Sequence, residues 1–354
     1  MAAINDNVFT AQEIENAMNA ALDFYIKGEA MSQTIQEKPT LAAFKQKQKT
    51  FPGSRGSIKG NVKGDYTTSF MGYSGDDTVE YKNPANIKQF SYDWFELHAG
   101  ISCTYSELKT NGISIVDSLT GDRTRQHSDS SASVITALLE DKLEDMGEGT
   151  ARSMNSMLFR DGTQSAKVFP GISSIITTSP TTGVVGGIDR SVNTWWRNRA
   201  LVGANKITAS ASSQTLTKTL RKEVRQLTRY GGKPSLLPAG SAFIEALELE
   251  IHEKGIYTQN GFINKGPTDL GSPDIQMRGI GQFYYEPLMD DLNMSKFCYF
   301  IDPRHIKLMV MDGEDWKRHS PARSPEKYVL YRAITWTGTL MADKMNCHGL
   351  YEVA

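Results

Sequence analysis

The chain has 354 residues, of which 39 are Lys or Arg and 40 are Asp or Glu, so its formal charge is −1. This total lacks the basic excess that proteins gripping nucleic acid usually carry, and 39% apolar residues suffice for a soluble chain with a real core. At roughly 150 residues per domain, the length predicts about two domains or one elaborated domain.

The cysteines and the first residues exclude further classes of protein. Cys103, Cys298 and Cys347 lie far apart and are odd in number, so they predict neither a disulfide framework nor a Cys-rich zinc site. The first ten residues are polar and contain no Lys or Arg, and no stretch approaches the roughly eighteen apolar residues of a spanning helix. We therefore expect a product made in the cytoplasm, with no targeting signal and no membrane segment.

Residues 11–27 form the first periodic segment. Their apolar residues recur at steps of three and four, Thr10 can cap the segment and Gly28 ends it. This pattern predicts a short amphipathic helix, which would be marginal alone and needs a surface to pack against.

Residues 38–93 are the most unusual part of the chain. Positions 38–64 hold basic residues and no acidic ones, whereas acidic residues dominate positions 65–96. Because large apolar residues are sparse and glycines frequent, we expect an extended two-stranded excursion with a flexible tip and no core of its own. It is either a disordered loop or an arm whose strands are completed by another subunit. In the second case opposite charges make contacts between subunits, through Arg55, Lys59, Lys63, Asp76, Asp77 and Glu80.

Strand-like residues follow at 87–103, and the strongest helical stripe of the chain covers about 130–159. The next part alternates between helices and strands, which predicts a small mixed sheet flanked by helices. Its elements are a basic amphipathic helix at 216–227, a strand at 234–237, an acidic helix at 242–253 capped by Ser241, and strands near Ile275 and 284–285. The last stretch is β-rich, at 297–301, 306–311, 328–341 and 347–353, with a polar connection at 318–325.

No catalytic motif emerges. The P-loop, the dinucleotide fingerprint and the nucleophile elbow are absent, and the six histidines never form the i, i+4 pair of a helix-borne metal site. Cys347-His348 could be drawn as nucleophile and base, although adjacent strand residues point to opposite faces. The carboxylate pairs at 290–291 and 314–315 are either cation ligands or solvated turns. Trp195-Trp196 is either a base-stacking platform or a buried aromatic anchor.

The order of these parts resembles that of the major capsid proteins of tailed double-stranded DNA bacteriophages, the Hong Kong phage-type fold that encapsulin compartments also use. Short motifs carry the resemblance over nearly the whole chain. They are Phe-Arg-Asp-Gly-Thr at 159–163, Phe-Pro-Gly-Ile at 169–172, Gly-Ile-Asp-Arg at 187–190 and Trp-Trp-Arg-Asn at 195–198.

The resemblance implies an α+β chain made of five parts, in which the returning strand of an extended loop starts at Thr78. The parts are an N-terminal arm (1–46), the extended β-hairpin loop (47–100), a peripheral domain (101–209) with a spine helix over about 130–159, an axial domain with a mixed sheet (210–295), and a β-rich return to the peripheral domain (296–354).

The function implied is structural, without catalytic residues, cofactor or metal. Copies are expected to assemble as hexamers and pentamers into the icosahedral head shell of a virion, after synthesis in the host cytoplasm. The expected partners are the chain itself, a scaffolding protein, a portal, a decoration protein and packaged double-stranded DNA bound without sequence specificity, but no membrane. Some family members join subunits by a Lys–Asn isopeptide bond; Lys59 or Lys63 would be the donor here, but the sequence identifies no partner.

Three alternatives stay open. An encapsulin-like compartment would enclose cargo enzymes in a shell of the same fold. A soluble enzyme with an unrecognised site would form a small oligomer with a pocket of converging ionisable groups. A nucleic-acid-binding module would show strongly salt-dependent binding.

Overall fold

The computed structural model describes residues 38–53, 56–66, 68, 70–81, 86–104, 106–107, 130–210, 212–253, 275–277, 281–319 and 326–354. The chain divides into two compact units. The first takes its described residues from 38–42, 96–155 and 311–337, and the second from 43–95, 156–310 and 338–354. The helix predicted at 11–27 and the candidate contact residue Arg55 lie outside the described residues.

The first unit combines a long helix with strands. The helix α5 (Ser130–Phe159) confirms the predicted spine helix, and its last four residues belong to the second unit. Strand β14 (Val329–Ala342) pairs with β4 (Phe95–Thr104) and, antiparallel, with β13 (Lys317–His319). The Lys142 ammonium of α5 donates to the Ser102 carbonyl at 3.1 Å and to the Glu107 carboxylate at 2.9 Å, which ties the helix to the end of β4.

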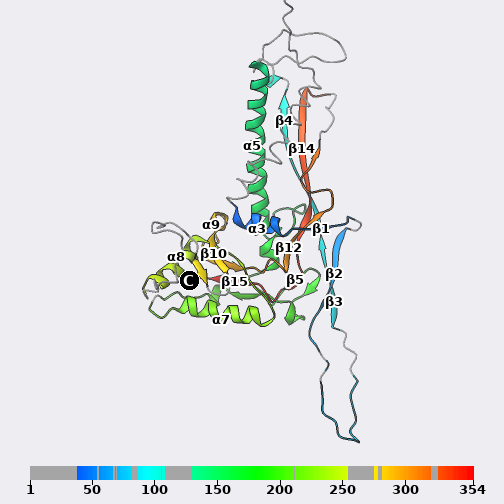
Figure 1. Cartoon of the computed structure of the whole chain (residues 1–354), viewed down its shortest axis with the longest axis vertical. Coiled ribbons are helices and arrows are strands. Elements are labelled where there is room, and N and C mark those ends of the chain that lie inside the picture. The colour runs from blue at the N-terminus through cyan, green and yellow to red at the C-terminus, as the bar shows by residue number, and fades with distance from the viewer. Residues whose placement is uncertain are drawn as a thin grey trace, which may run out of the picture. The chain divides into compact units, whose positions relative to one another are not determined.

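A six-stranded mixed sheet organises the second unit (Figure 1). Neighbouring strands pair in parallel at β7–β15 and β8–β10, and antiparallel elsewhere. The strand order is β7 (Arg199–Leu201), β15 (Gly349–Glu352), β11 (Phe297–Phe300), β8 (Leu236–Ala239), β10 (Gly281–Tyr285) and β9 (Ile275–Met277). This arrangement confirms the predicted mixed sheet.

Two amphipathic helices pack on one core with this sheet, namely α7 (Thr215–Arg229) and α8 (Ser241–Glu253). Their apolar residues recur every three or four positions, so each helix buries one face. The shared core contains Leu216, Leu220, Leu227, Phe243, Leu247, Phe283, Phe300 and Tyr351.

The N-terminus of α7 is capped from a distant part of the chain. Gln214, at its N-cap position, has a left-handed backbone (φ 53°) and makes no side-chain cap hydrogen bond. Instead the buried Glu250 carboxylate of α8 accepts the backbone N–H groups of Leu216 at 2.8 Å and Thr217 at 2.9 Å. It also accepts the Thr217 hydroxyl and the Ser210 N–H, so a single carboxylate joins α7, α8 and the segment before α7.

A tight turn follows the spine helix. The Gly171 N–H donates to the Arg160 carbonyl at 2.9 Å, and Ser173 donates to the Phe159 carbonyl. A Cβ on Gly171 would meet the carbonyl oxygens of Met157, Leu158 and Arg160 well inside the 3.0 Å that real Cβ atoms keep. The glycine of the Phe-Pro-Gly-Ile motif is therefore required by space rather than by backbone angle.

Shorter elements complete the description. Strand β12 pairs antiparallel with the end of β14, from Ile306 opposite Ala342 to Val310 opposite Gly338, and β1 lies beside β12. Strands β2 and β3 form a hairpin, as do β5 and β6. The bounds are α3 (Pro39–Gln46), β1 (Lys49–Phe51), β2 (Ser57–Lys63), β3 (Ile87–Asp93), α6 (Ile172–Ile175), β5 (Val184–Val185), β6 (Ile188–Asp189), η1 (Thr194–Trp196), η2 (Gly203–Asn205), α9 (Pro287–Asp291) and β12 (Ile306–Met311).

Two predictions about strands were wrong. The strand returning from the extended loop starts at Ile87 and not at Thr78, because the ladder ends at the Lys63–Ile87 pair and residues 78–81 have no strand opposite them. The polar connection predicted from Arg318 is partly strand, since β13 pairs with β14 up to His319.

Among the described helices, none is both long enough and apolar enough to cross a bilayer.

Candidate assembly surfaces

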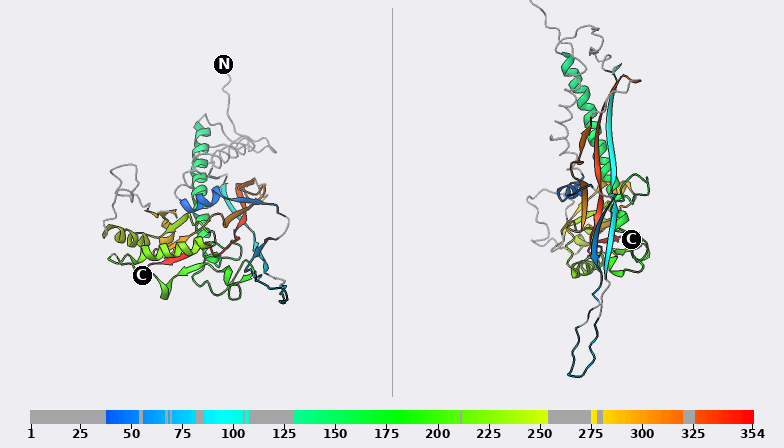
Figure 2. Two further views of the ribbon diagram at one scale, coloured as in Figure 1. Left: turned by 60° about the horizontal axis from the view of Figure 1, so that its bottom comes forward. Right: turned by 90° about the vertical axis from the view of Figure 1, so that its right-hand side faces the viewer.

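The β2–β3 hairpin presents two of the predicted charged residues to solvent, Lys59 and Lys63. Seven residue pairs hold it together, from Ser57 opposite Asp93 to Lys63 opposite Ile87. Lys59 and Lys63 lie on β2 and are exposed. Beyond the strands, residues 70–81 extend away from the rest of the second unit (Figures 1 and 2).

Among the described residues, the structure does not bring Lys59 or Lys63 together with Asp76 or Asp77. Asp76, Asp77 and Glu80 lie on the exposed segment beyond the strands. The Asp77 carboxylate accepts the Ser74 N–H at 2.8 Å, which shapes a local turn. Within the described residues, Lys59 and Lys63 form no ion pair with Asp76 or Asp77.

Sequence reasoning missed the apolar side chains of the same segment. Tyr66, Tyr73 and Tyr81 are 77%, 73% and 94% exposed, and exposed apolar side chains that gather on one segment mark an interaction site. We call the exposed apolar side chains here the tip surface: Tyr66, Phe70, Met71, Tyr73, Val79 and Tyr81. The sequence signal that could have revealed them is the recurrence of aromatic residues in a segment otherwise rich in Gly, Ser and Asp.

The base of the hairpin is anchored on the second unit. Phe90 and Tyr92 of β3 are buried, and Phe90 stacks on Trp196 with 6.5 Å between ring centroids. Tyr92 packs against Gly186, where a Cβ would come within 2.8 Å of the ring, and the Ser91 N–H donates to the Gly186 carbonyl. A two-stranded hairpin is marginal alone, so these contacts explain its seven regular pairs.

The adjacent tryptophans serve this anchor. Trp196 is buried and donates through its indole N–H to the Val185 carbonyl at 2.9 Å. Trp195 packs edge-on against Trp196 and closes on Gly64, where a Cβ would lie 2.6 Å from the indole. The buried anchor is confirmed for Trp196, while Trp195 is half-buried and packs against it.

The carboxylate pairs are also accounted for in part. Asp290 of α9 accepts the Ser241 N–H at 3.1 Å and the Tyr285 hydroxyl at 2.8 Å, so it joins α9 to the start of α8 and to the end of β10. Glu314 pairs with Lys317. No group of three or more His, Cys, Asp or Glu that could hold a metal ion gathers in the part of the chain that the structure describes.

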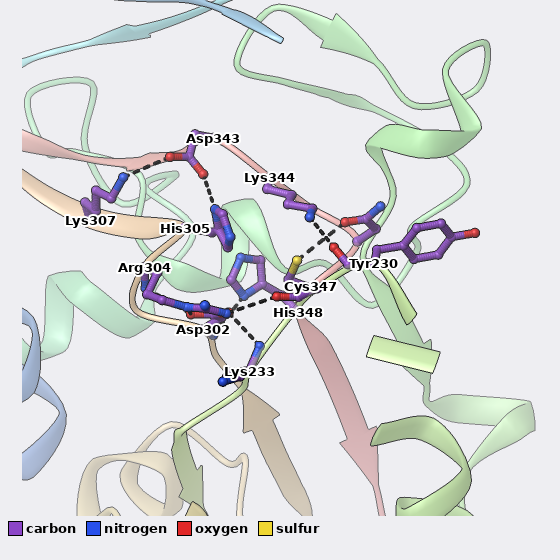
Figure 3. Close-up of polar contacts among 12 residues, drawn as sticks. Tyr230, Lys233, Asp302, Arg304, His305, Lys307, Asp343, Lys344, Cys347 and His348 are labelled. Carbon is purple, nitrogen blue, oxygen red and sulfur yellow. Dashed lines mark hydrogen bonds and ion pairs between the residues drawn. The ribbon is translucent and has the colours of Figure 1, made fainter. Parts of the chain in front are cut away.

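The three cysteines are buried and unsuited to nucleophilic chemistry. Burial raises the pKa of Cys103 and Cys298, and raises the pKa of Cys347 to about 11, so these thiols stay protonated at neutral pH. The His348 Nδ1 accepts the Asp302 N–H and the Cys347 thiol lies 3.5 Å from the Asn346 side-chain oxygen, so the nucleophile–base pair does not form (Figure 3).

A polar cluster surrounds these two residues (Figure 3). The fully buried Asp302 carboxylate accepts the Lys233 N–H at 2.7 Å and two guanidinium bonds from Arg304. The Asp343 carboxylate binds His305 at 2.6 Å and Lys307 at 2.9 Å. These bonds connect the β11–β12 corner to the chain after β14 and to the turn after α7, so the cluster is structural.

We expect this cluster to make the second unit sensitive to acid. Burial lowers the pKa of His348 from 6.5 to about 4. The charge of Asp302 raises this pKa and that of His305 lowers it, but burial is the largest effect. The unfolded chain takes up the proton first, so stability is full above pH 6.5 and falls as the pH drops toward 4, by about 1.4 kcal/mol per pH unit.

The measurement is urea unfolding at pH 7, 6 and 5 for the wild type, His348→Gln and the half-buried control His319→Gln. His348→Gln should flatten the loss between pH 6.5 and 5, whereas His319→Gln should follow the wild type. Equal slopes for all three would contradict the role of His348.

Comparisons with known proteins give a consistent result for the fold. No family model matches the chain, and no curated protein matches its sequence. The capsid asymmetric unit of cyanophage A-1(L) aligns over 89% of this chain and 92% of that chain, with a TM-score of 0.62 and 13% identity. The capsid of a native GTA particle aligns over 88% and 90%, with a TM-score of 0.53 and 12% identity.

The chain has the Hong Kong phage-type capsid fold. This capsid fold confirms the predicted fold class. At 12–13% identity little of the likeness remains in the residues themselves, and the comparison of structures detects it where the family models and the curated sequences give no match.

Proposed function

We propose that the chain is the structural subunit of an icosahedral phage head, in which copies assemble as hexamers and pentamers around double-stranded DNA. The observation that carries this proposal is the capsid fold, matched over about nine-tenths of the chain by subunits of two solved capsids. The proposed location is the virion, reached after synthesis in the host cytoplasm.

The tip surface supports a role in assembly. Burying one large apolar side chain contributes about 1.5–3 kcal/mol, so six such side chains on one segment favour contact with another protein surface. The hairpin base is anchored by Phe90 and Tyr92, so the strands that lead to the tip surface are held on the second unit. Each copy can then cover a different surface of its neighbour, and such contacts close into rings around five-fold and six-fold axes.

The domain arrangement is proposed on the same basis. It has an arm at 1–46, an extended loop at 47–100, a peripheral domain at 101–209 and 296–354, and an axial domain at 210–295. Strands from three of these ranges build the six-stranded sheet, so the axial domain shares its sheet with residues before and after it. The further partners proposed are a scaffolding protein, a portal, a decoration protein and the packaged DNA.

Electron microscopy tests the function. The chain is expressed alone and together with its neighbouring genes, and both preparations are examined in negative stain. Closed shells or rings of five and six subunits are expected. A monodisperse monomer or dimer in both preparations would contradict the proposal.

Charge reversal tests the hairpin contacts. In this proposal Lys59 and Lys63 pair with acidic residues of a neighbouring copy, such as Asp76, Asp77 and Glu80. Lys59→Glu with Lys63→Glu should lower the melting temperature of assembled shells in low salt and less so in high salt, because salt screens exposed charges. The control reverses the exposed Lys167 and Lys327. Identical melting of both variants would exclude these pairs.

A further inference from the structure

The solvent-facing side of α7 carries a continuous stripe of positive charge. Its five cations are all exposed and follow one another at steps of one, three and four residues, which places them on one face of the helix. The stripe, which we call the α7 stripe, is about 16 Å long at 1.5 Å per residue. It consists of Lys218, Arg221, Lys222, Arg225 and Arg229.

Nothing described in the chain neutralises the α7 stripe. The sole acidic residue of α7, Glu223, is buried and accepts two bonds from Arg199 of β7. Within the described residues none of the five cations forms an ion pair; Lys218 donates to the Ser213 carbonyl, and Arg229 lies over the Tyr230 ring.

This arrangement is unfavourable for the isolated chain. Like charges four residues apart destabilise a helix by about 0.2–0.5 kcal/mol per pair, and the α7 stripe contains three such pairs. The apolar face of α7 is buried on the opposite side, so the stripe faces away from the sheet. The one acidic residue interspersed with these cations, Glu223, is buried and does not reach the stripe. An external anion is therefore expected to offset the repulsion.

The length and regular spacing of the stripe suit a nucleic-acid backbone, and the neighbouring helix cannot neutralise it. The neighbouring helix α8 offers only Glu245 and Glu248 as described carboxylates outside its buried face, too few for five cations. Double-stranded DNA carries one charge per roughly 1.7 Å of axis, so a stripe of about 16 Å faces about nine phosphates.

We propose that the α7 stripe is the surface through which the shell subunit contacts the sugar-phosphate backbone of the enclosed DNA. This inference rests on the proposed function for the enclosure, while the chemistry of the stripe stands independently of it. The contact reads no sequence, and a few phosphate contacts give the weak, salt-sensitive binding that lets DNA move during packaging.

The test measures binding of a fluorescent random-sequence DNA duplex across a series of salt concentrations. The variant Arg221→Gln, Lys222→Gln, Arg225→Gln removes three charges with a residue that suits helices. The control variant removes three exposed cations elsewhere, Arg160→Gln, Lys167→Gln and Lys327→Gln. Shells of all three proteins are also compared for nucleic-acid content by absorbance.

For five phosphate contacts we expect the logarithm of the binding constant to fall with the logarithm of salt with a slope of about −4.5. In the α7 variant the slope should become shallower by about three, whereas the control should keep the wild-type slope. Shells of the α7 variant should also contain less nucleic acid. Unchanged binding by the α7 variant would overturn the proposal. So would a variant that binds DNA normally but no longer forms shells, because the stripe would then be a contact between proteins. Stripe-dependent DNA binding by a wild type that forms no shells would refute the capsid function and leave the α7 contact standing.

Discussion

Gly171→Ala should cost about 4 kcal/mol or more of the free energy of unfolding, enough to deplete soluble protein. The added Cβ would overlap three backbone carbonyl oxygens at the end of α5, and backbone atoms cannot swing aside as a side-chain terminus can. Costs of this size are exceptional for point mutations and come from a few mechanisms, of which overpacking is one. The measurement is the yield of soluble chain and its urea unfolding, followed by tryptophan fluorescence.

Gly149→Ala is the matched control. Gly149 lies inside α5, and a Cβ there meets no atom within 4 Å. The same substitution should therefore stabilise the chain by up to about 1 kcal/mol, because Ala is the better helix former. Similar effects of both substitutions would contradict the steric account of Gly171.

Glu250→Ala should lower the free energy of unfolding of the second unit by about 3 kcal/mol. The substitution leaves two backbone N–H groups at the start of α7 without their acceptor, one of them in the buried Leu216, and bonds to a charged group contribute about 1.5–3 kcal/mol each. Urea unfolding at neutral pH measures the loss.

Two further variants separate the cap from the helix that carries it. Glu250→Gln keeps a side-chain oxygen and should lose less than Glu250→Ala. Glu245→Ala removes an exposed carboxylate of the same helix and should change stability by less than about 0.5 kcal/mol. If Glu245→Ala were as costly as Glu250→Ala, the cap would not explain the stability of α7.

Local patterns predicted the regular elements well. The apolar stripe of the spine helix extends over many turns, and the observed bounds of α5 agree with it. Helices α7 and α8 bury one apolar face each, so their periodicity was equally clear. The mixed sheet followed from the alternation of helices and strands, since such an order permits few arrangements.

Contacts between residues far apart in the chain could not be predicted from the sequence. The cap of α7 comes from Glu250, 34 residues after Leu216, and no spacing rule relates these positions. The space excluded around Gly171, and the packing of Gly64 and Gly186 against Trp195 and Tyr92, depend on the folded chain. The tip surface was missed because the loop was interpreted by its charges. That its apolar side chains are exposed can be seen only from the path of the backbone in the folded chain.

The α7 stripe shows how a total can hide a local feature. The overall charge of −1 argued against a surface that binds nucleic acid. A net charge, however, sums over the whole chain and does not show how charge is distributed between different faces of the protein. The helix was correctly predicted to be basic and amphipathic. The sequence did not show that Glu223 is buried against Arg199, which leaves only positive charges on the exposed face of the helix.

In the proposed head shell, released from its host, the chain would meet oxygen and peroxides instead of a reducing cytoplasm. Oxidation of cysteine starts from the thiolate and needs access, and each of the three thiols is buried with its pKa raised. Sulfenic acids and stray disulfides between copies should therefore form only after local unfolding. The rate of cysteine oxidation in such a particle would then be set by local unfolding of its subunits and not by the redox state of its surroundings.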